Sequence, residues 1–252
     1  MARAIHRRAV AAAGIALVAM AATSPIGTAA VGPSVTGGTV ASVRPYNGQD
    51  VGVAHPIIVT FTNRVLDRAA AERTISVTEP ANLTGRFEWL SDNVVQWVPD
   101  HYWPANSHIS LMAGGERRNF GTHGVVLGVG SISAHTFTVS INGVVMRQMP
   151  ASMGKPRFQT PVGSFSVLEK YNSIVMDSRT IGIPLEDPEG YKLTVLNAVR
   201  ITWGGVYVHS APWSVGSQGY ANVSHGCINL SPDNSWWYFN EVGIGDPVVI
   251  NW

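Results

Sequence analysis

Short runs of alternating apolar and polar residues, divided by turn-forming residues, occupy the chain from residue 41 to residue 121. Alternation with a period of two is typical of strands that have one buried face. Runs at a spacing of roughly ten residues, with Gly, Pro and Asn between them, predict an all-β sandwich. We expect strands at Val51–Val53, Pro56–Thr62, Thr74–Thr78, Gly85–Trp89, Val94–Pro99 and His108–Met112, and a short helix at Asp67–Glu72.

The second half of the chain continues the β pattern. Asn142-Gly143 separates two extended runs, Ser133–Ser140 and Val144–Arg147, and Asn-Gly is a strong hairpin signal. Ser231-Pro232-Asp233 predicts a helix start, because it offers a cap, a proline in the first turn and an acid at the positive helix end. This helix should end before Gly243, with its aromatic residues in the core. Further strands are expected at Gly163–Glu169, Ala198–Trp203, Val206–His209 and Pro247–Ile250.

These patterns predict a mainly β protein with two sandwich-like domains and a few short helices. The glycine-rich stretch Gly121–Gly130 is expected to be a linker that merges into the second domain. We therefore predict a leader at residues 1–30, a flexible segment at 31–40, a first domain at 41–122 and a second at 123–252.

The first thirty residues have the pattern of a secretory signal peptide. A basic start containing Arg3, Arg7 and Arg8 precedes the apolar run Ala9–Ala22, and Thr28–Ala30 offers a cleavage site. The apolar run is shorter than the ~20 residues of a membrane-spanning helix, although an uncleaved anchor stays open as an alternative. The leader predicts export to the periplasm or cell wall, with the outer face of the plasma membrane as a further location. Since the leader contains no cysteine, a lipoprotein anchor is excluded.

Charge excludes one class of partner. The whole chain has 17 basic and 16 acidic residues, and removal of the three leader arginines leaves 14 basic against 16 acidic, or about −2. No cluster of Lys and Arg remains that could neutralise a row of phosphates. We therefore expect no nucleic-acid partner.

Cys227 is the only cysteine of the chain, and His209 lies 18 residues before it. In an exported protein an unpaired cysteine is either a reactive thiol or a buried structural residue. The surrounding Ser224–Asn229 sequence and the nearby histidine favour a nucleophile, since a thiol needs a neighbour that takes its proton. The remaining histidines of the first domain lack metal-ligand spacing and are expected at the surface or in turns: His55, His101, His108 and His123.

Three ordered motifs carry a specific resemblance. Thr160-Pro161-Val162-Gly163-Ser164-Phe165, His209-Ser210-Ala211-Pro212-Trp213 and Ser224-His225-Gly226-Cys227-Ile228-Asn229 together resemble the L,D-transpeptidase (YkuD) family. The resemblance covers residues 125–251 and extends more loosely to residue 40. The first domain resembles the bacterial immunoglobulin-like domains of exported cell-wall proteins, without their disulfide. This arrangement is similar to that of the actinobacterial members.

The resemblance implies a role for each matching residue. Cys227 would be the nucleophile, His209 its general base, and the Ser210 carbonyl the group that orients His209. His225 and Gly226 would support the site, with nearby backbone N–H groups forming the oxyanion hole. The donor peptide would contact Tyr191, Gly204, Gly205, Asn229, Met176 and Trp213, and Tyr171–Thr194 would form a flap over the site.

The reaction implied is acyl transfer between peptidoglycan stem peptides. Cys227 would attack the third residue of a tetrapeptide stem, release D-alanine, and pass the acyl group to a diaminopimelate amine to form a 3→3 cross-link. No metal or organic cofactor is implied. Carbapenems would acylate the same thiol, and the protein is expected to be a monomer.

Three alternatives stay open. With water as the acceptor, the same residues would make an L,D-carboxypeptidase or endopeptidase. His209, His225 and Cys227 could instead bind zinc. Both domains could also be wall-binding modules without catalysis. The sequence leaves undetermined the acceptor, leader cleavage, the oligomeric state and any partner of the first domain.

Overall fold

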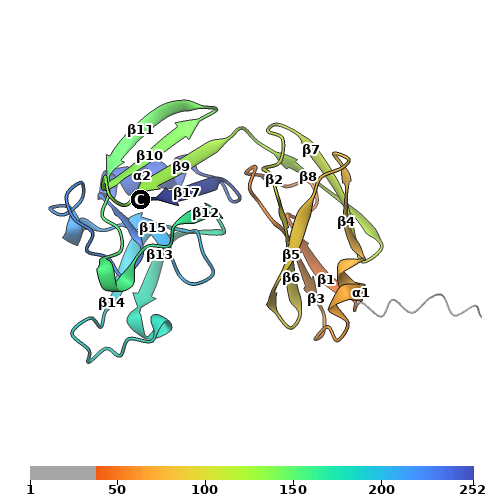
Figure 1. Ribbon diagram of the computed structural model, residues 1–252, viewed down its shortest axis with the longest axis horizontal. Coiled ribbons are helices and arrows are strands. Elements are labelled where there is room, and N and C mark those ends of the chain that lie inside the picture. Colours follow the sequence, from red (N-terminus) through yellow and green to blue (C-terminus); the bar gives the residue numbers. More distant parts are fainter. Residues whose placement is uncertain (1–37) are drawn as a thin grey trace, which may run out of the picture. The chain divides into compact units, whose positions relative to one another are not determined.

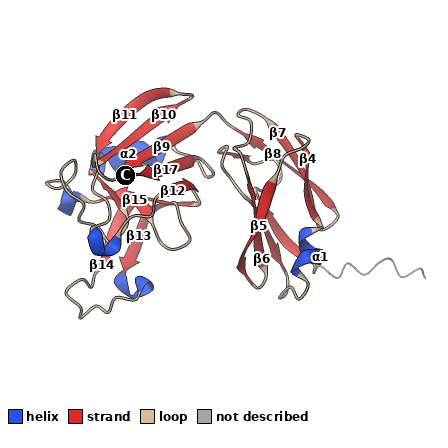
Figure 2. Ribbon diagram, viewed as in Figure 1, coloured by secondary structure: helices blue, strands red, loops and turns tan. Residues whose placement is uncertain are grey.

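The computed structural model describes residues 38–252, which form mainly β-structure as predicted (Figures 1 and 2). The predicted leader and most of the predicted segment 31–40 lie outside the described residues. Within the described part of the chain, no helix is both long and apolar enough to cross a membrane.

The first domain contains two four-stranded sheets with the orders β1-β3-β6-β5 and β2-β8-β7-β4. Inward side chains of both sheets form one apolar core, in which Ile57, Ile109 and Leu111 are fully buried. The strands are β1 Val40–Arg44, β2 Asp50–Val51, β3 Ile57–Phe61, β4 Ile75–Glu79, β5 Gly85–Ser91, β6 Val94–Pro99, β7 His108–Ala113 and β8 Glu116–Thr122. The predicted short helix is α1, Arg68–Glu72, whose N-cap side chain Asp67 accepts from Ala70 N at 2.9 Å.

His55 lies in a turn, as one part of its prediction allows, because its N–H donates to Gly52 O at 3.1 Å, but it is buried and its predicted surface placement is wrong. It is only 5% exposed, and its carbonyl accepts a hydrogen bond from Trp103 Nε1 at 2.7 Å. The ring is kept in the core because Nδ1 lies 2.5 Å from the Pro56 carbonyl. Burial lowers the pKa of His55 to about 4, and the ring is therefore neutral at pH 7.

The second domain contains a five-stranded sheet, β11-β10-β9-β17-β12, and a four-stranded sheet, β13-β14-β15-β16. Its core includes Phe137, Val208, Ile228 and Tyr238, all fully buried. The strands are β9 Val126–Ser131, β10 Thr136–Ile141, β11 Val144–Pro150, β12 Gly163–Ser166, β13 Glu169–Asp177, β14 Lys192–Arg200, β15 Tyr207–Ser210, β16 Ile228–Leu230 and β17 Pro247–Asn251. The helices are α2, Pro232–Glu241, and the short 3-10 turns η1 Pro156–Phe158, η2 Ser178–Ile181 and η3 Pro212–Ser214.

The β10–β11 hairpin forms as its Asn-Gly sequence predicts. Ile141 pairs with Val144, and the two turn residues both have positive φ, 49° at Asn142 and 83° at Gly143. These angles are those of a type I′ turn, which matches the twist of the flanking strands.

The predicted linker Gly121–Gly130 is largely a strand. β9 begins at Val126 and lies between β10 and β17 in the middle of its sheet. Its glycines serve packing, because a Cβ on Gly128 would lie 2.7 Å from Cζ of the buried Phe137 ring. Glycine composition thus indicated flexibility where the structure uses glycine for close contact.

The predicted flap Tyr171–Thr194 is also shorter than expected. Residues 169–177 and 192–200 pair as the antiparallel strands β13 and β14, which leaves only 178–191 as the connecting segment. The expected strand Gly163–Glu169 is divided between β12 and β13, which belong to different sheets. Local pattern could not show this division, because it depends on pairing with distant strands.

Helix α2 begins and ends close to its predicted limits, and the Ser231 side chain accepts from Asn234 N at 3.3 Å. Tyr238 is fully buried, with its ring centroid 5.0 Å from that of Phe137. Trp236 is 60% exposed, so its predicted place in the core is wrong. The two residues are two positions apart and therefore lie on different faces of the helix.

Candidate active site

Two neighbouring parallel strands bring the predicted nucleophile and base together. β15 pairs with β16 so that Val208 lies opposite Ile228 and His209 opposite Asn229. Cys227 directly precedes β16, at the end of the strand pair where β15 begins, and His209 lies two positions further along; both residues line the same pocket. Because Val208 and Ile228 are fully buried, core packing fixes the relative position of the two strands.

The His209 ring is buried and held by a main-chain carbonyl. Its Nδ1 lies 2.9 Å from Ser210 O, and the residue is 3% exposed. A carbonyl can only accept, so Nδ1 carries the proton and Nε2 is left with its lone pair. Burial lowers the pKa of His209 to about 4, partly offset by the carbonyl hydrogen bond. At pH 7 the ring is a neutral base.

The Cys227 thiol is also neutral in the resting protein. Burial raises its pKa to about 11, against a smaller opposite effect of the Tyr207 backbone. The thiol donates to Gly205 O, with Sγ 3.8 Å from the oxygen. Among the hydrogen bonds of residues 38–252, none joins Cys227 to His209. The site therefore holds a neutral thiol beside a neutral imidazole.

Hydrogen bonds fix the backbone around Cys227, the predicted nucleophile. Gly226 has φ 118°, a value open to glycine and strained for other residues. Ser224 Oγ accepts from Gly226 N at 3.0 Å and donates to Cys227 O at 2.6 Å. Thr160 Oγ1 donates to Gly226 O at 2.8 Å. Since Ser224 N–H donates to Met153 O and Gly226 N–H to Ser224 Oγ, the N–H groups of His225 and Cys227 are the backbone donors of this turn that lack an acceptor within the described chain.

A pocket of about 250 Å³ opens at the thiol. It contains four of the predicted donor-contacting residues, whereas Gly204 and Gly205 are outside its lining, although Gly205 O accepts from the thiol. Sequence reasoning did not name Leu193, Val223 or Ser224 as lining residues. The full lining is Met176, Tyr191, Leu193, His209, Trp213, Val223, Ser224, His225, Cys227 and Asn229.

Asn229 holds the pocket wall through its side chain. Its Nδ2 donates to Ser214 Oγ at 3.1 Å, and the residue is buried. This bond ties β16 to the η3 turn, which carries Trp213. The Trp213 ring lies 6.0 Å from the His209 ring, so Asn229 also helps to place the aromatic neighbour of the base.

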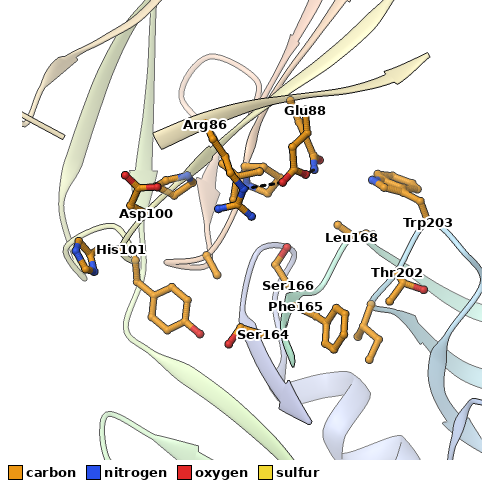
Figure 3. Close-up of a pocket in the computed structure, with 17 residues that line it drawn as sticks. Arg86, Glu88, Asp100, His101, Ser164, Phe165, Ser166, Leu168, Thr202 and Trp203 are labelled. Carbon is orange, nitrogen blue, oxygen red and sulfur yellow. Dashed lines mark hydrogen bonds and ion pairs between the residues drawn. The ribbon is translucent and has the colours of Figure 1, made fainter. Parts of the chain in front are cut away.

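A larger cavity of about 570 Å³ lies apart from Cys227 (Figure 3). Its lining includes the Arg86–Glu88 ion pair and Trp203, and no nucleophilic thiol. The predicted site residues therefore lie in the smaller of these two cavities. Among the described residues, no three His, Cys, Asp or Glu side chains are grouped as metal ligands would be.

Two family models match the chain in succession. A bacterial Ig domain matches residues 12–115, and the L,D-transpeptidase catalytic domain matches residues 127–250. L,D-transpeptidase 1 of Mycobacterium tuberculosis is 61% identical over 211 residues, which cover 84% of each chain. The chain belongs to the L,D-transpeptidase family. Probable L,D-transpeptidase 3 of the same organism is 51% identical and covers 85% of this chain and 87% of its own.

Solved structures of L,D-transpeptidases have the same fold. The structure of LdtMt1 in complex with imipenem has a TM-score of 0.82 at 60% identity, covering 84% of this chain and 99% of that one. An L,D-transpeptidase from Mycobacterium smegmatis has a TM-score of 0.79 at 61% identity, covering 84% and 98%. The predicted family, the Ig-like domain and the mainly β architecture are thereby confirmed.

Proposed function

We propose that this L,D-transpeptidase forms 3→3 peptidoglycan cross-links by cysteine acyl transfer. The observation that carries the proposal is a half-buried thiol that shares one pocket with a buried histidine whose Nε2 is free to accept a proton. The free Cys227 N–H adds the donor that an oxyanion requires. Thiol, base and oxyanion donor are the parts that acyl transfer needs.

In the first half-reaction, Cys227 Sγ attacks the carbonyl carbon of the third residue of a tetrapeptide stem. The thiol proton passes to His209 Nε2, and Cys227 N–H donates to the oxyanion. The tetrahedral intermediate then collapses, the peptide C–N bond breaks, and the His209 proton goes to the leaving amine of D-alanine. The product is a thioester on Cys227.

In the second half-reaction, the side-chain amine of a neighbouring diaminopimelate attacks the thioester carbonyl. His209 Nε2 takes a proton from the attacking nitrogen and returns it to the departing Cys227 sulfur. One amide forms, one thioester breaks, and the resting neutral pair is restored. A general base needs to be unprotonated to start each half, and the low pKa of His209 keeps it so at pH 7.

The largely apolar lining of the pocket supports transfer to an amine over transfer to water. Met176, Leu193 and Trp213 surround the thiol with apolar surface. Such a lining excludes water from the thioester while a peptide is bound. An extended donor peptide could run beside Gly204-Gly205, where missing side chains leave the backbone accessible.

We also propose the predicted division of the chain, with a leader at 1–30, a segment at 31–40, an Ig-like domain at 41–122 and a catalytic domain at 123–252. The division is supported by the end of β8 at Thr122 and the start of β9 at Val126. A cell-wall substrate requires export, which agrees with the leader pattern of the sequence.

β-Lactams of the carbapenem type are proposed to acylate Cys227. Structures of relatives contain imipenem in one case and a faropenem-derived adduct in another. A strained lactam carbonyl would meet the same thiol, base and N–H donor as the stem peptide. Its adduct would therefore report on the assembled site.

Incubation with a purified disaccharide-tetrapeptide, followed by mass spectrometry, tests the proposed reaction. We expect a dimer that has lost one D-alanine, and no product with Cys227→Ala. Tripeptide without dimer would contradict the transferase and favour the carboxypeptidase. Unchanged substrate with a folded wild-type protein would contradict both.

A further inference from the structure

The segment of residues 178–191 between β13 and β14, here called the flap, is held together by its own hydrogen bonds. Ser178 N donates to Tyr191 O at 2.8 Å, and Tyr191 N donates to Ser178 Oγ at 3.0 Å. Gly190 N donates to Asp187 O at 2.7 Å. The flap is thus a closed loop whose position depends on what it contacts outside itself.

Glu189 provides those contacts. Its Oε2 accepts from Lys155 Nζ at 2.5 Å and lies 2.9 Å from His225 Nε2. Apart from bonds to Asp177 at the end of β13, these are the hydrogen bonds that join the flap to other described parts of the chain. Hydrogen bonds from Lys155 and His225 lower the pKa of Glu189, so the carboxylate is charged at pH 7.

The partner ring of Glu189 belongs to the nucleophile motif. His225 lies two residues before Cys227, and its ring centroid is 5.0 Å from that of Tyr191 and 4.8 Å from that of Phe158. Tyr191 and His225 both line the catalytic pocket. The flap therefore holds His225 twice, through a carboxylate and through a pocket-lining aromatic ring.

Lys155 connects the same point to a third segment. It lies just before the η1 turn, and its Nζ is 5.5 Å from the ring centroid of Phe158 in that turn. The side chains of Lys155, Glu189 and His225 are 26%, 30% and 20% exposed. Solvent therefore only partly screens the ion pair between Lys155 and Glu189. Three segments distant in sequence meet at one carboxylate.

We propose that Glu189 is a positioning residue. Its hydrogen bonds hold the flap against the nucleophile motif and so fix the position of Tyr191, which forms part of the wall of the donor pocket. The inference rests on the proposed function, because the pocket is taken to bind the acyl donor. Without the hydrogen bonds of Glu189, the flap is held by β13 and β14 and by the contact of the Tyr191 ring with His225. Binding of the donor peptide would then have to order the flap and the Tyr191 side chain, and this loss of conformational entropy would weaken donor binding.

The expected signature is a weaker donor complex with an unchanged thiol. In Glu189→Gln the KM for the tetrapeptide donor should rise about fivefold, the loss expected for a partly exposed charge-assisted pair, with kcat within about twofold. Lys155→Met should raise KM by no more than Glu189→Gln does, because Glu189 keeps its contact with His225, and the double variant should be no worse than Glu189→Gln, because the Lys155–Glu189 interaction is already lost in that variant. Alkylation of Cys227 by iodoacetamide should keep its rate, since a small reagent needs no pocket wall.

Glu186→Ala is the matched control, since Glu186 is an exposed carboxylate of the same flap. Hydrogen exchange of the flap amides, measured by mass spectrometry, gives a readout that does not depend on activity. Exchange should be faster in Glu189→Gln and unchanged in Glu186→Ala, with the thermal midpoint of each variant close to that of the wild type.

Unchanged exchange and KM in Glu189→Gln would overturn the inference. So would additive KM effects of the Lys155 and Glu189 variants, or a parallel loss of alkylation rate that indicates general damage. The two proposals can fail separately. If the wild-type protein transfers no acyl group but Glu189→Gln still has faster flap exchange, the proposed function is contradicted and the positioning role of Glu189 is supported.

Discussion

At the scale of single residues, burial controls the resting chemistry of the site. The same desolvation raises the pKa of Cys227 to about 11 and lowers that of His209 to about 4. Both shifts favour neutral forms, so the site differs from a preformed thiolate–imidazolium pair. The proposed mechanism therefore requires the thiol to lose its proton to His209 as it attacks.

The pH dependence of thiol alkylation tests this neutral pair. Only the thiolate reacts with iodoacetamide, so the rate constant for Cys227 should keep rising from pH 7 to about pH 10 without a plateau. A preformed ion pair would instead give a flat profile near neutral pH. The unfolded protein in denaturant is the matched control, and its rate should level off above the ordinary thiol pKa of about 8.5.

Sequence motifs named Cys227, His209 and Ser210 as candidate site residues without help from the fold, because the three lie in two short segments of distinctive composition. They did not indicate that Ser224 would occupy Gly226 N–H, or that Glu189 would reach His225. Both facts depend on side-chain rotamers and on loop positions that no local pattern specifies. Ser224 is the first residue of a named motif, whereas Glu189 lies outside all three motifs, so the role of Ser224 was the easier of the two to predict from sequence.

At the scale of secondary structure elements, turn and capping motifs predicted structure correctly, whereas amino-acid composition led to wrong predictions. The Asn-Gly hairpin and the capped helix α2 formed as predicted, because each is decided within a few residues. β9 was mistaken for a linker and the flap was drawn too long, since sheet pairing decides both. Trp236 also shows that aromatic composition does not determine which helix face is buried.

Gly128→Ala tests the packing role of glycine in β9. The added Cβ would press on the buried Phe137 ring, so we expect a loss of about 1–3 kcal/mol in the free energy of unfolding. Urea unfolding with an unchanged m-value measures the effect.

Gly216→Ala is the control for that substitution, because a Cβ there would meet no atom within 4 Å. It should leave stability within about 0.5 kcal/mol of the wild type. Equal midpoints for the two variants would show that β9 tolerates a side chain and that its glycines serve another purpose.

At the scale of the whole molecule, buried ionisable groups make stability depend on pH in two directions. His55 and His209 have lowered pKa values, so their contribution is present above about pH 6.5 and is lost as pH falls through about 4. Asp246 behaves in the opposite way, because burial raises its pKa to about 6. Its contribution is present at low pH and is lost as pH rises through 6.

Asp246→Asn separates these effects. Oδ2 of Asp246 accepts from Gly243 N at 2.7 Å, while the buried Oδ1 has no hydrogen-bond partner and lies 3.8 Å from His123 Nε2. An amide resembles the protonated acid, so the variant should gain about 1 kcal/mol more stability at pH 8 than at pH 5, relative to the wild type. Urea unfolding at the two pH values measures the difference, and a larger gain at pH 5 would contradict the assignment.

The overall architecture was the most predictable feature of the molecule. Strand spacing and the three motifs indicated an Ig-like domain followed by a YkuD domain, and the family models agree. The buried state of His55 was missed, because its place in the core follows from Trp103 and Pro56, which meet it only in the folded chain.

The central claim is that Cys227 is an acyl acceptor activated by its surroundings. Incubation of the purified protein with a carbapenem, followed by intact mass spectrometry beside Cys227→Ser, tests it most directly. We predict one covalent adduct per wild-type chain and none on the variant. A folded wild-type protein with a titratable thiol and no adduct would contradict the account, as would an adduct that persists in Cys227→Ser.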